Sequence, residues 1–540
     1  MGVVSQVVAL LSFVWIVRRI VQFRGLINAY KDVPRRTVLV SPFSTLIFYT
    51  PLQWVSIPGV FLPRLKVFRE DYDAFAGIGS DIFVVVHMFP LGAQLMLADA
   101  NAIRDVSAAR VSFPKPVSDY KAVSLYGTNM IGAEGHEWAR HRKACASSFS
   151  DRNLQLVWDS AAQTMQEIFS SWSGEPEIRI PIIRVWTLKI ALHILSAAGF
   201  GMPTPWEESD SAESKRNTAF QKTLEDALDD LPWKFVLPDR AWGNEAEREA
   251  VSVAGWAGNG WLGKRAKQAA VTFSELERYM KEMIQDRRTS GINESQKDLL
   301  SNLISASGDG AGGLTMREVT GNTFVFLLAG HETSAHSLAF MFGLLALDPD
   351  EQERLYQHIK AVLGDREPTY SDFNSLNRVL ATIHETLRLY PPVTGIPKEC
   401  VTDTLVNTGC EGTDELRTVR ILEGTRVAIQ IAAVAYNPHY WEDPWAFNPS
   451  RFLKDPSRAR DGTFLTFSSG ARSCIGRRFS EVESVAVATL LLLRYKISVD
   501  TTLFKDVEGE NALERRKRFL ETDSRITVFP INAPLIFTRR

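Results

Sequence analysis

The segment Phe467-Ser-Ser-Gly470-Ala-Arg472-Ser-Cys474-Ile-Gly476 decides how the rest of this 540-residue chain is interpreted. The first glycine can take the positive φ angle that a tight loop needs, and the last lets the backbone approach a flat ligand closely. A long apolar, helix-like segment follows, so Cys474 should lie near unpaired N–H groups at the positive end of a helix. Cationic neighbours add to that field: Arg472, Arg477 and Arg478. These features favour a thiolate, the form of cysteine that ligates metals.

A lone cysteine ahead of a helix is more often a buried structural residue than a ligand. The flanking residues favour a ligand here, because every fixed position of Phe-x-x-Gly-x-Arg-x-Cys-x-Gly is present. This pattern resembles the haem-binding loop of the cytochrome P450 family. The resemblance implies haem b with Cys474 as axial iron ligand, a thiolate that favours cleavage of bound O₂. Arg472 would then meet a haem propionate, and Phe467, Gly470 and Gly476 would shape the loop around the haem.

Composition excludes several other classes of protein. The 61 basic and 63 acidic residues give a net charge of −2, which gives no reason to expect nucleic-acid binding. The four cysteines are far apart and form no C-x-x-C pair, which argues against a zinc site or a disulfide framework. They fit a reducing compartment instead. Their positions are 145, 400, 410 and 474.

The N-terminus begins with an uncharged apolar run, Val3 to Val17, followed by cationic residues. As a helix this run is about 22 Å long, short of the ~30 Å hydrocarbon core of a bilayer. Extension to Phe23 with snorkelling arginines closes the difference. A cleaved signal peptide, the alternative, would need its positive charges before the run. We therefore expect residues 1–23 to form a single-pass anchor in the endoplasmic reticulum membrane, with the catalytic body on the cytoplasmic side.

Thr37 to Pro63 is a second uncharged stretch, repeatedly interrupted by proline. An irregular hairpin in the membrane interface fits the prolines and Trp54. A second transmembrane helix, the alternative, would place the body on the lumenal side. We expect residues 24–63 to be a membrane-interface linker and residues 64–540 to be one catalytic domain.

Within that domain, short apolar runs at Ile82–Val86 and Leu95–Leu97 predict a small β-sheet. Helical periodicity dominates afterwards, so the predicted fold class is mainly α with a small β subdomain. Arg420 to Ala433 alternates as a strand does, and Ser524 to Phe537 reads as a closing hairpin. Asp286 to Gly313, polar and glycine-rich toward its end, is expected to be a surface connection.

Two segments gain a role from the resemblance. Trp138 and Arg142 are four residues apart on one helix face, a spacing that by itself indicates only a solvated basic face. In the P450 family such a pair hydrogen-bonds a haem propionate, which implies that role here. Pro232 to Ala270 interleaves tryptophans with cations, as interfacial helices do, and the matching family region roofs the substrate pocket. A partner-docking surface or plain core remains the alternative.

Thr315 to Leu347 reads as a helix, apolar nearly all round and therefore buried in a core. Small and polar residues interrupt it at Ala329-Gly-His-Glu-Thr-Ser334. A threonine hydroxyl there can bond to the carbonyl four residues earlier, bending the helix and opening a gap. The segment resembles the family's Ala-Gly-x-Glu-Thr, which implies an O₂ groove with a proton relay through Thr333, supported by Glu332. A buried threonine that only satisfies its own helix is the alternative.

A further helix, Asn374 to Tyr390, carries Glu385 and Arg388 on one face. Such pairs are usually exposed and contribute little. Their place before Pro-Pro and about ninety residues ahead of Cys474 matches the characteristic ion pair of the P450 family, with Arg451 as third member. The resemblance implies a structural network that locks the backbone behind the haem.

These motifs predict a cytochrome P450 fold, with haem between the long central helix and the cysteine loop and its helix. The chain resembles membrane-anchored, microsomal-type members of the family, which implies a monooxygenase, and the residues around Phe324 to Phe340 look fungal. It would insert one oxygen atom of O₂ into a hydrophobic terpenoid, steroid or polycyclic aromatic in secondary or xenobiotic metabolism. Electrons would come from NADPH through a membrane NADPH–cytochrome reductase, with cytochrome b5 as a second candidate donor. The alternatives are a haem-thiolate isomerase or dehydratase, which needs no proton relay, and a non-catalytic haem protein.

Overall fold

The computed structural model describes eleven stretches of the chain: residues 2–42, 57, 59–60, 72–207, 212–231, 261–289, 298–308, 312–409, 416–459, 462–524 and 526–540. Contacts within the chain define two compact units. The first, called here the β unit, comprises Met1–Pro116, Val393–Ala446 and Ser457–Ser473. The second, the helical unit, comprises Val117–Pro392, Phe447–Pro456 and Cys474–Arg540.

The β unit is built on a five-stranded sheet with the order β1-β2-β3-β8-β5. Its strands are β1 (Arg35–Val40), β2 (Ile82–Phe89), β3 (Gly92–Leu97), β8 (Arg426–Gln430) and β5 (Gly395–Glu399). The β1–β2 and β3–β8 pairs are parallel, and the β2–β3 and β5–β8 pairs are antiparallel. Both predicted strand segments fall within β2 and β3, where continuous apolar runs are buried. The unit also contains the β6–β7 pair (Thr404–Gly409 and Leu416–Ile421) and the short helices α4 (Asp73–Ala76), α5 (Ala100–Ala108) and α18 (Ile431–Ala435).

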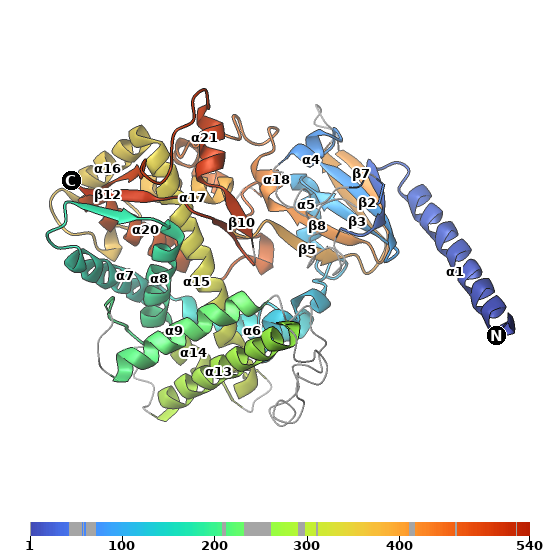
Figure 1. Ribbon diagram of the computed structural model, residues 1–540, viewed down its shortest axis with the longest axis horizontal. Coiled ribbons are helices and arrows are strands. Elements are labelled where there is room, and N and C mark those ends of the chain that lie inside the picture. Colours follow the sequence, from blue (N-terminus) through green and yellow to red (C-terminus); the bar gives the residue numbers. More distant parts are fainter. Residues whose placement is uncertain are drawn as a thin grey trace. The chain divides into compact units, whose positions relative to one another are not determined.

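The N-terminal helix α1 runs from Gly2 to Ala29, six residues past the predicted end of the anchor. Its segment Val4–Ala29 has a mean hydropathy of 1.7, is long enough to cross a membrane, and has none of its apolar window buried by protein. Figure 1 shows it extending away from strands β2 and β3 of the same unit. At its end, the Tyr30 hydroxyl hydrogen-bonds Thr425 Oγ1 (2.6 Å) and accepts from the Leu422 amide (3.0 Å). The helix is therefore tied to the β unit at one end and stacks Trp15 on Phe89, while most of its apolar surface stays exposed.

The helical unit is organised around α15 (Met316–Leu347), drawn in yellow in Figure 1. The other helices are α6 (Gly135–Ala146), α7 (Asp151–Ser171), α8 (Ile183–Ile194), α9 (Ala212–Asp230), α13 (Trp261–Thr289), α14 (Leu299–Ser305), α16 (Pro349–Leu363), α17 (Asn377–Leu389), α19 (Ser450–Lys454), α20 (Arg477–Arg494) and α21 (Ala512–Phe519). Two small sheets complete it: β4 (Glu177–Ile180), β12 (Leu535–Arg539) and β9 (Tyr495–Val499) form one, and β10 (Thr522–Ser524) and β11 (Val528–Pro530) form the other.

The start of α15 is set by a capping box. The Glu318 amide donates to Thr315 Oγ1 (3.3 Å), and the Thr315 amide donates to Glu318 Oε2 (2.8 Å), so two otherwise unpaired N–H groups are satisfied. From Val319 onward the helix is buried on almost every side, as its apolar sequence predicts. It packs against α8, α17 and α20, among others, which makes it the centre of the helical unit's core.

Two sequence-based predictions about connections are wrong. Ser524 to Phe537 does not form a hairpin, because β11 pairs with β10 whereas β12 pairs with β9 and β4. Asp286 to Gly313 is not only a surface connection, because it contains the buried helix α14, capped by the Asp298 carboxylate on the Ser301 amide (2.7 Å). Arg420 to Ala433 is divided among β7, β8 and α18.

The predicted irregular interface hairpin of residues 37–63 is wrong where it is described, because Thr37 to Val40 belong to β1 and pair with β2. The rest of that hairpin beyond Pro42, and residues 232–260 of the amphipathic segment, lie largely outside the described residues.

Candidate active site

Cys474 lies just before α20, whose N-cap is Gly476. Gly470 adopts φ +65°, the conformation that the loop was predicted to require. Phe467, Gly470 and Arg472 belong to the β unit, whereas Cys474 and Gly476 belong to the helical unit. The chain thus passes from the β unit to the helical unit within this loop, between Ser473 and Cys474.

Cys474 is an exposed residue, whereas Cys145 and Cys400 are buried. Protein nonetheless surrounds it on its other sides, and this desolvation raises the pKa of the Cys474 thiol. The Gly476 amide, Arg142 and Arg477 act in the opposite direction but do not outweigh it. In the protein alone, burial therefore disfavours the thiolate more strongly than the neighbouring amide and cations favour it. A cation bound to the sulfur would supply the missing stabilisation.

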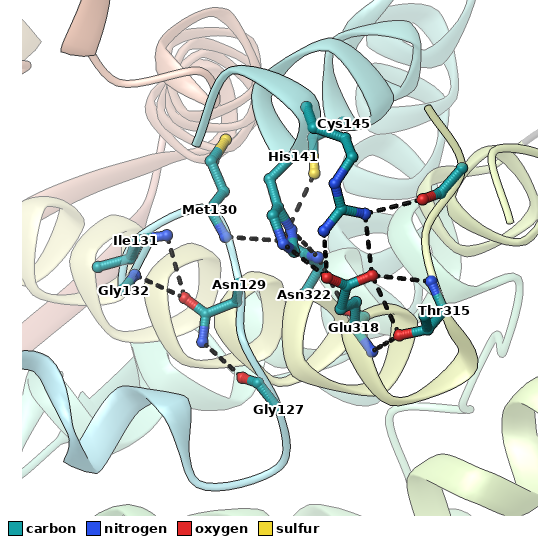
Figure 2. Close-up of polar contacts among 12 residues, drawn as sticks. Gly127, Asn129, Met130, Ile131, Gly132, His141, Cys145, Thr315, Glu318 and Asn322 are labelled. Atoms are coloured by element: carbon teal, nitrogen blue, oxygen red, sulfur yellow. Dashed lines mark hydrogen bonds and ion pairs between the residues drawn. The ribbon is translucent and has the colours of Figure 1, made fainter. Parts of the chain in front are cut away.

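Helix α6 presents Trp138 and Arg142 on a half-buried face, while His141 and Cys145 are buried. The buried side chains converge on Asn322 of α15, as Figure 2 shows. Asn322 Nδ2 lies 2.9 Å from His141 Nδ1, and the Cys145 thiol donates to Asn322 Oδ1 (3.6 Å). Burial raises the pKa of Cys145 to about 12, so this thiol stays protonated. The contacts fix α6 on α15 and so set the position of the predicted propionate-binding pair.

An ion pair on the neighbouring turn adds to this attachment. Arg140 forms a bidentate ion pair with Glu318, in which Arg140 Nη1 donates to Glu318 Oε2 (3.0 Å) and Nη2 donates to Oε1. The Arg140 guanidinium lowers the pKa of Glu318 to about 2. Glu137, His141 and Glu318 could together offer three metal-ligand atoms. Because the Arg140 charge already occupies the Glu318 carboxylate, this cluster is a structural ion pair.

The three residues of the predicted ion network meet in the structure. Glu385 and Arg388 are fully buried. The Arg388 guanidinium donates two hydrogen bonds of 2.8 Å to the Glu385 carboxylate, from Nε to Oε2 and from Nη2 to Oε1. Glu385 Oε1 also accepts from the Asn448 amide (2.9 Å) and from Arg451 Nε (3.4 Å). Helices α17 and α19 are therefore joined around one buried carboxylate.

The interruption in α15 is visible as a change in burial. Every residue from Val319 to Leu328 and from Ser334 to Ala346 is buried, and so is His331. The residues between them that keep some exposure are Ala329, Gly330, Glu332 and Thr333. The Thr333 hydroxyl donates to the Ala329 carbonyl (2.7 Å), the back-bond that the sequence predicted. The helix thus has one accessible patch of small and polar groups in an otherwise buried surface.

The Glu332 carboxylate has partners that sequence reasoning missed. Thr527 Oγ1 donates to Glu332 Oε2 (3.0 Å) and lies 2.9 Å from His336 Nδ1. Burial raises the pKa of Glu332, against smaller lowering effects of Thr527 and Arg184. The spacing of Glu332 and His336 by one helical turn could have suggested a shared partner, but Thr527 is 195 residues away.

A second buried acid was also missed. Glu483 on α20 is completely buried, and neither carboxylate oxygen has a hydrogen-bond partner among the described residues. Burial raises the pKa of Glu483 to about 8, despite a small opposing effect of Ser334. Two residues earlier, burial would likewise raise the pKa of Glu481, but His384 and Arg477 outweigh it and lower that pKa to about 2.

Comparison with known proteins decides the family. A model described as Cytochrome P450 matches residues 258–519. Cytochrome P450 monooxygenase 124 of Postia placenta is 40% identical over 489 residues, which is 90% of this chain and 90% of that protein. The chain belongs to the cytochrome P450 family. Cytochrome P450 monooxygenase ORF6 of Penicillium roqueforti is 30% identical over 458 residues, 77% of this P450 and 76% of its relative. The haem domain of cytochrome P450DA shares the fold, with a TM-score of 0.69 at 20% identity over 93% of this chain and 98% of that one.

Membership of the P450 family implies haem, redox partners and a hydrophobic substrate. The donor set of the chain fits the cofactor. Cys474 is an exposed cysteine in the field of Arg142 and Arg477, and Arg142 would also compensate a carboxylate of a haem. The accessible patch around Thr333 includes the small residues Ala329 and Gly330.

Proposed function

We propose that this P450 is a haem-thiolate monooxygenase that inserts one oxygen atom of O₂ into a hydrophobic small molecule. The observation that carries the proposal is the patch on α15, where Glu332 and Thr333 keep partial exposure inside a buried helix. An isomerase or dehydratase acting on a peroxide needs no proton delivery, and a haem carrier needs none either. A carboxyl group beside an accessible hydroxyl is what an enzyme that reduces O₂ requires.

The residues divide into three roles. Cys474 would ligate the iron, within a loop shaped by Phe467, Gly470 and Gly476, and the cationic or hydrogen-bonding side chains of Arg472, Trp138 and Arg142 would hold the propionates. When bound, the haem supplies the iron centre at which O₂ is reduced. Glu385, Arg388 and Arg451 would keep α17 and α19 in place as a rigid support, since a buried, fully bonded carboxylate tolerates little movement.

Thr333 and Glu332 would deliver protons. Because burial raises the pKa of Glu332, this side chain holds a proton at a higher pH than a solvated glutamate does. The Thr333 hydroxyl, anchored on the Ala329 carbonyl, fixes an oxygen atom one residue further along the same patch. A proton that leaves Glu332 can then be passed on at a defined position rather than taken from bulk water.

We further propose residues 1–23 as a single-pass anchor in the endoplasmic reticulum membrane, with the predicted catalytic domain (64–540) on the cytoplasmic side. Of the predicted linker (24–63), residues 24–29 continue α1 and Arg35–Val40 form β1 of the sheet. The uncovered apolar surface of α1 supports an anchor. Electrons would come from NADPH through a membrane NADPH–cytochrome reductase docking near Arg472, Arg477 and Arg478, with cytochrome b5 as a second donor. The substrate would be a terpenoid, steroid or polycyclic aromatic of secondary or xenobiotic metabolism.

The test combines purified holoprotein with an NADPH–cytochrome reductase and measures O₂ consumption. The proposal predicts NADPH-dependent O₂ uptake, and an oxygenated product with compounds that shift the haem spin state in a screen of terpenoids, steroids and polycyclic aromatics. Turnover of a hydroperoxide without NADPH, together with no O₂ uptake in its presence, would favour the isomerase alternative instead.

A further inference from the structure

Glu332, Thr527 and His336 form a continuous hydrogen-bonded line on one side of α15. Glu332 and His336 lie one turn apart on the helix, and Thr527, which immediately precedes β11, lies between them. The Thr527 oxygen is 3.0 Å from Glu332 Oε2 and 2.9 Å from His336 Nδ1. Thr527 is 5% exposed and His336 is 2% exposed, so bulk water does not compete for these bonds.

The hydroxyl has a single hydrogen, which fixes the direction of the line. When Glu332 is ionised, Thr527 donates to the carboxylate and accepts from His336 Nδ1–H. Nε2 of His336 is then the unprotonated nitrogen, and it has no hydrogen-bond partner among the described residues. When Glu332 gains a proton and donates to Thr527, Thr527 can donate to His336 Nδ1 only once the single imidazole proton is on Nε2, so the two protonation states of Glu332 use the two tautomers of His336. The line can therefore serve either protonation state of Glu332 without moving its heavy atoms.

Other charged and titratable groups face this line. Arg184 of α8 lowers the pKa of both Glu332 and His336, and His331 further lowers the pKa of His336, which falls to about 3. His336 is therefore neutral throughout the physiological range, as the line requires. The Arg184 guanidinium also lies 4.5 Å from the centre of the Phe529 ring, next to the same segment.

We propose that Thr527 is a positioning residue for proton delivery: held by His336, its hydroxyl keeps the Glu332 carboxyl group in one orientation beside Thr333 and stabilises the carboxylate left after each proton is given up. This inference rests on the proposed monooxygenase function. The proton passes from the Glu332 carboxyl group toward the Thr333 side of the patch. Thr527 then donates its hydrogen to the carboxylate until a new proton arrives from solvent.

The test measures, as a function of pH, the fraction of consumed O₂ that is released as hydrogen peroxide by holoenzyme with reductase and NADPH. In the wild type this fraction should rise with pH as Glu332 ionises. Thr527→Val removes the bond to the carboxylate while keeping side-chain shape. The hydrogen bond stabilises the charged form of Glu332, so its loss should raise the midpoint, the pH at which the peroxide fraction is half-maximal, by about one unit. Thr527→Ser keeps the hydroxyl and should restore the wild-type midpoint.

Two further variants make the outcome decisive. His336→Phe removes the ring nitrogen that fixes Thr527 and should shift the midpoint in the same direction, so the inference can be tested even where Thr527→Val does not fold. Thr333→Ala should raise the peroxide fraction without moving the midpoint. Wild-type O₂ uptake with unchanged midpoints in both Thr527→Val and His336→Phe would overturn the inference alone. No NADPH-dependent O₂ uptake by the wild type would overturn the proposed function, and the inference with it.

Discussion

Replacing Glu483 by glutamine should stabilise the protein at neutral and alkaline pH. The native state holds this carboxyl group fully buried without hydrogen-bond partners among the described residues, and its pKa rises from 4.5 to about 8. Below pH 4.5 the group is protonated in both folded and unfolded chains and does not affect stability. Between pH 4.5 and 8 only the folded chain keeps the proton, so stability falls as pH rises. Glutamine has a similar shape and does not titrate.

The magnitude follows from the size of the shift. The difference of 3.5 pKa units, from 4.5 to about 8, corresponds to about 5 kcal/mol of stability lost across that range. Between pH 6 and 8.5 the loss is about 3 kcal/mol. The unfolding entropy is about 2 cal/mol/K per residue. Between pH 6 and 8.5, the Tm of the wild type should therefore fall by about 2–3 °C more than the Tm of Glu483→Gln.

Thermal unfolding of detergent-solubilised holoprotein at several pH values measures this difference directly. Glu481→Gln is the matched control, because the pKa of Glu481 is lowered to about 2 by His384 and Arg477. That lowering contributes about 3 kcal/mol of stability above pH 4.5, which is lost as pH falls through 2. Glu481→Gln should therefore be less stable than the wild type at pH 7, whereas Glu483→Gln should be more stable. Parallel Tm profiles for the wild type and Glu483→Gln would refute the reasoning.

Three other perturbations test separate parts of the account. Thr333→Ala should retain haem but release a larger share of consumed O₂ as hydrogen peroxide, and unchanged coupling would remove Thr333 from the mechanism. Arg388→Ala leaves the Glu385 carboxylate buried without its main partner, at a cost of about 3–5 kcal/mol, and should give no holoprotein; a normal haem content would contradict this. A chain that lacks residues 2–29 but keeps Tyr30 should be found in the supernatant after membranes are washed at high salt. Its retention in the membrane pellet would show that another segment binds the membrane.

The features that the sequence predicted best are local. The core helix α15, the Thr333 back-bond and the pairing of Glu385 with Arg388 all depend on residues within one or two turns of a helix, so spacing alone brings them together. The capping box at Thr315 is equally local, although it was not predicted. Arg451 was placed with that pair through the resemblance to a family.

The features that could not be predicted depend on distant segments or on a balance of opposing energies. Thr527 reaches Glu332 across 195 residues, and nothing in its local sequence indicates that partner. Strand alternation near the C-terminus predicts β structure but not pairing, so β11 and β12 were joined wrongly. The pKa of Cys474 depends on whether burial or neighbouring charge dominates, and only the packed environment determines that.

The central claim is that residue 474 holds the haem iron through a thiolate. Reduced holoprotein exposed to carbon monoxide tests it most directly. The account predicts the red-shifted absorption band that thiolate ligation produces, and its loss in Cys474→His with haem still bound. Wild-type protein that binds haem and carbon monoxide but lacks this band would contradict the account.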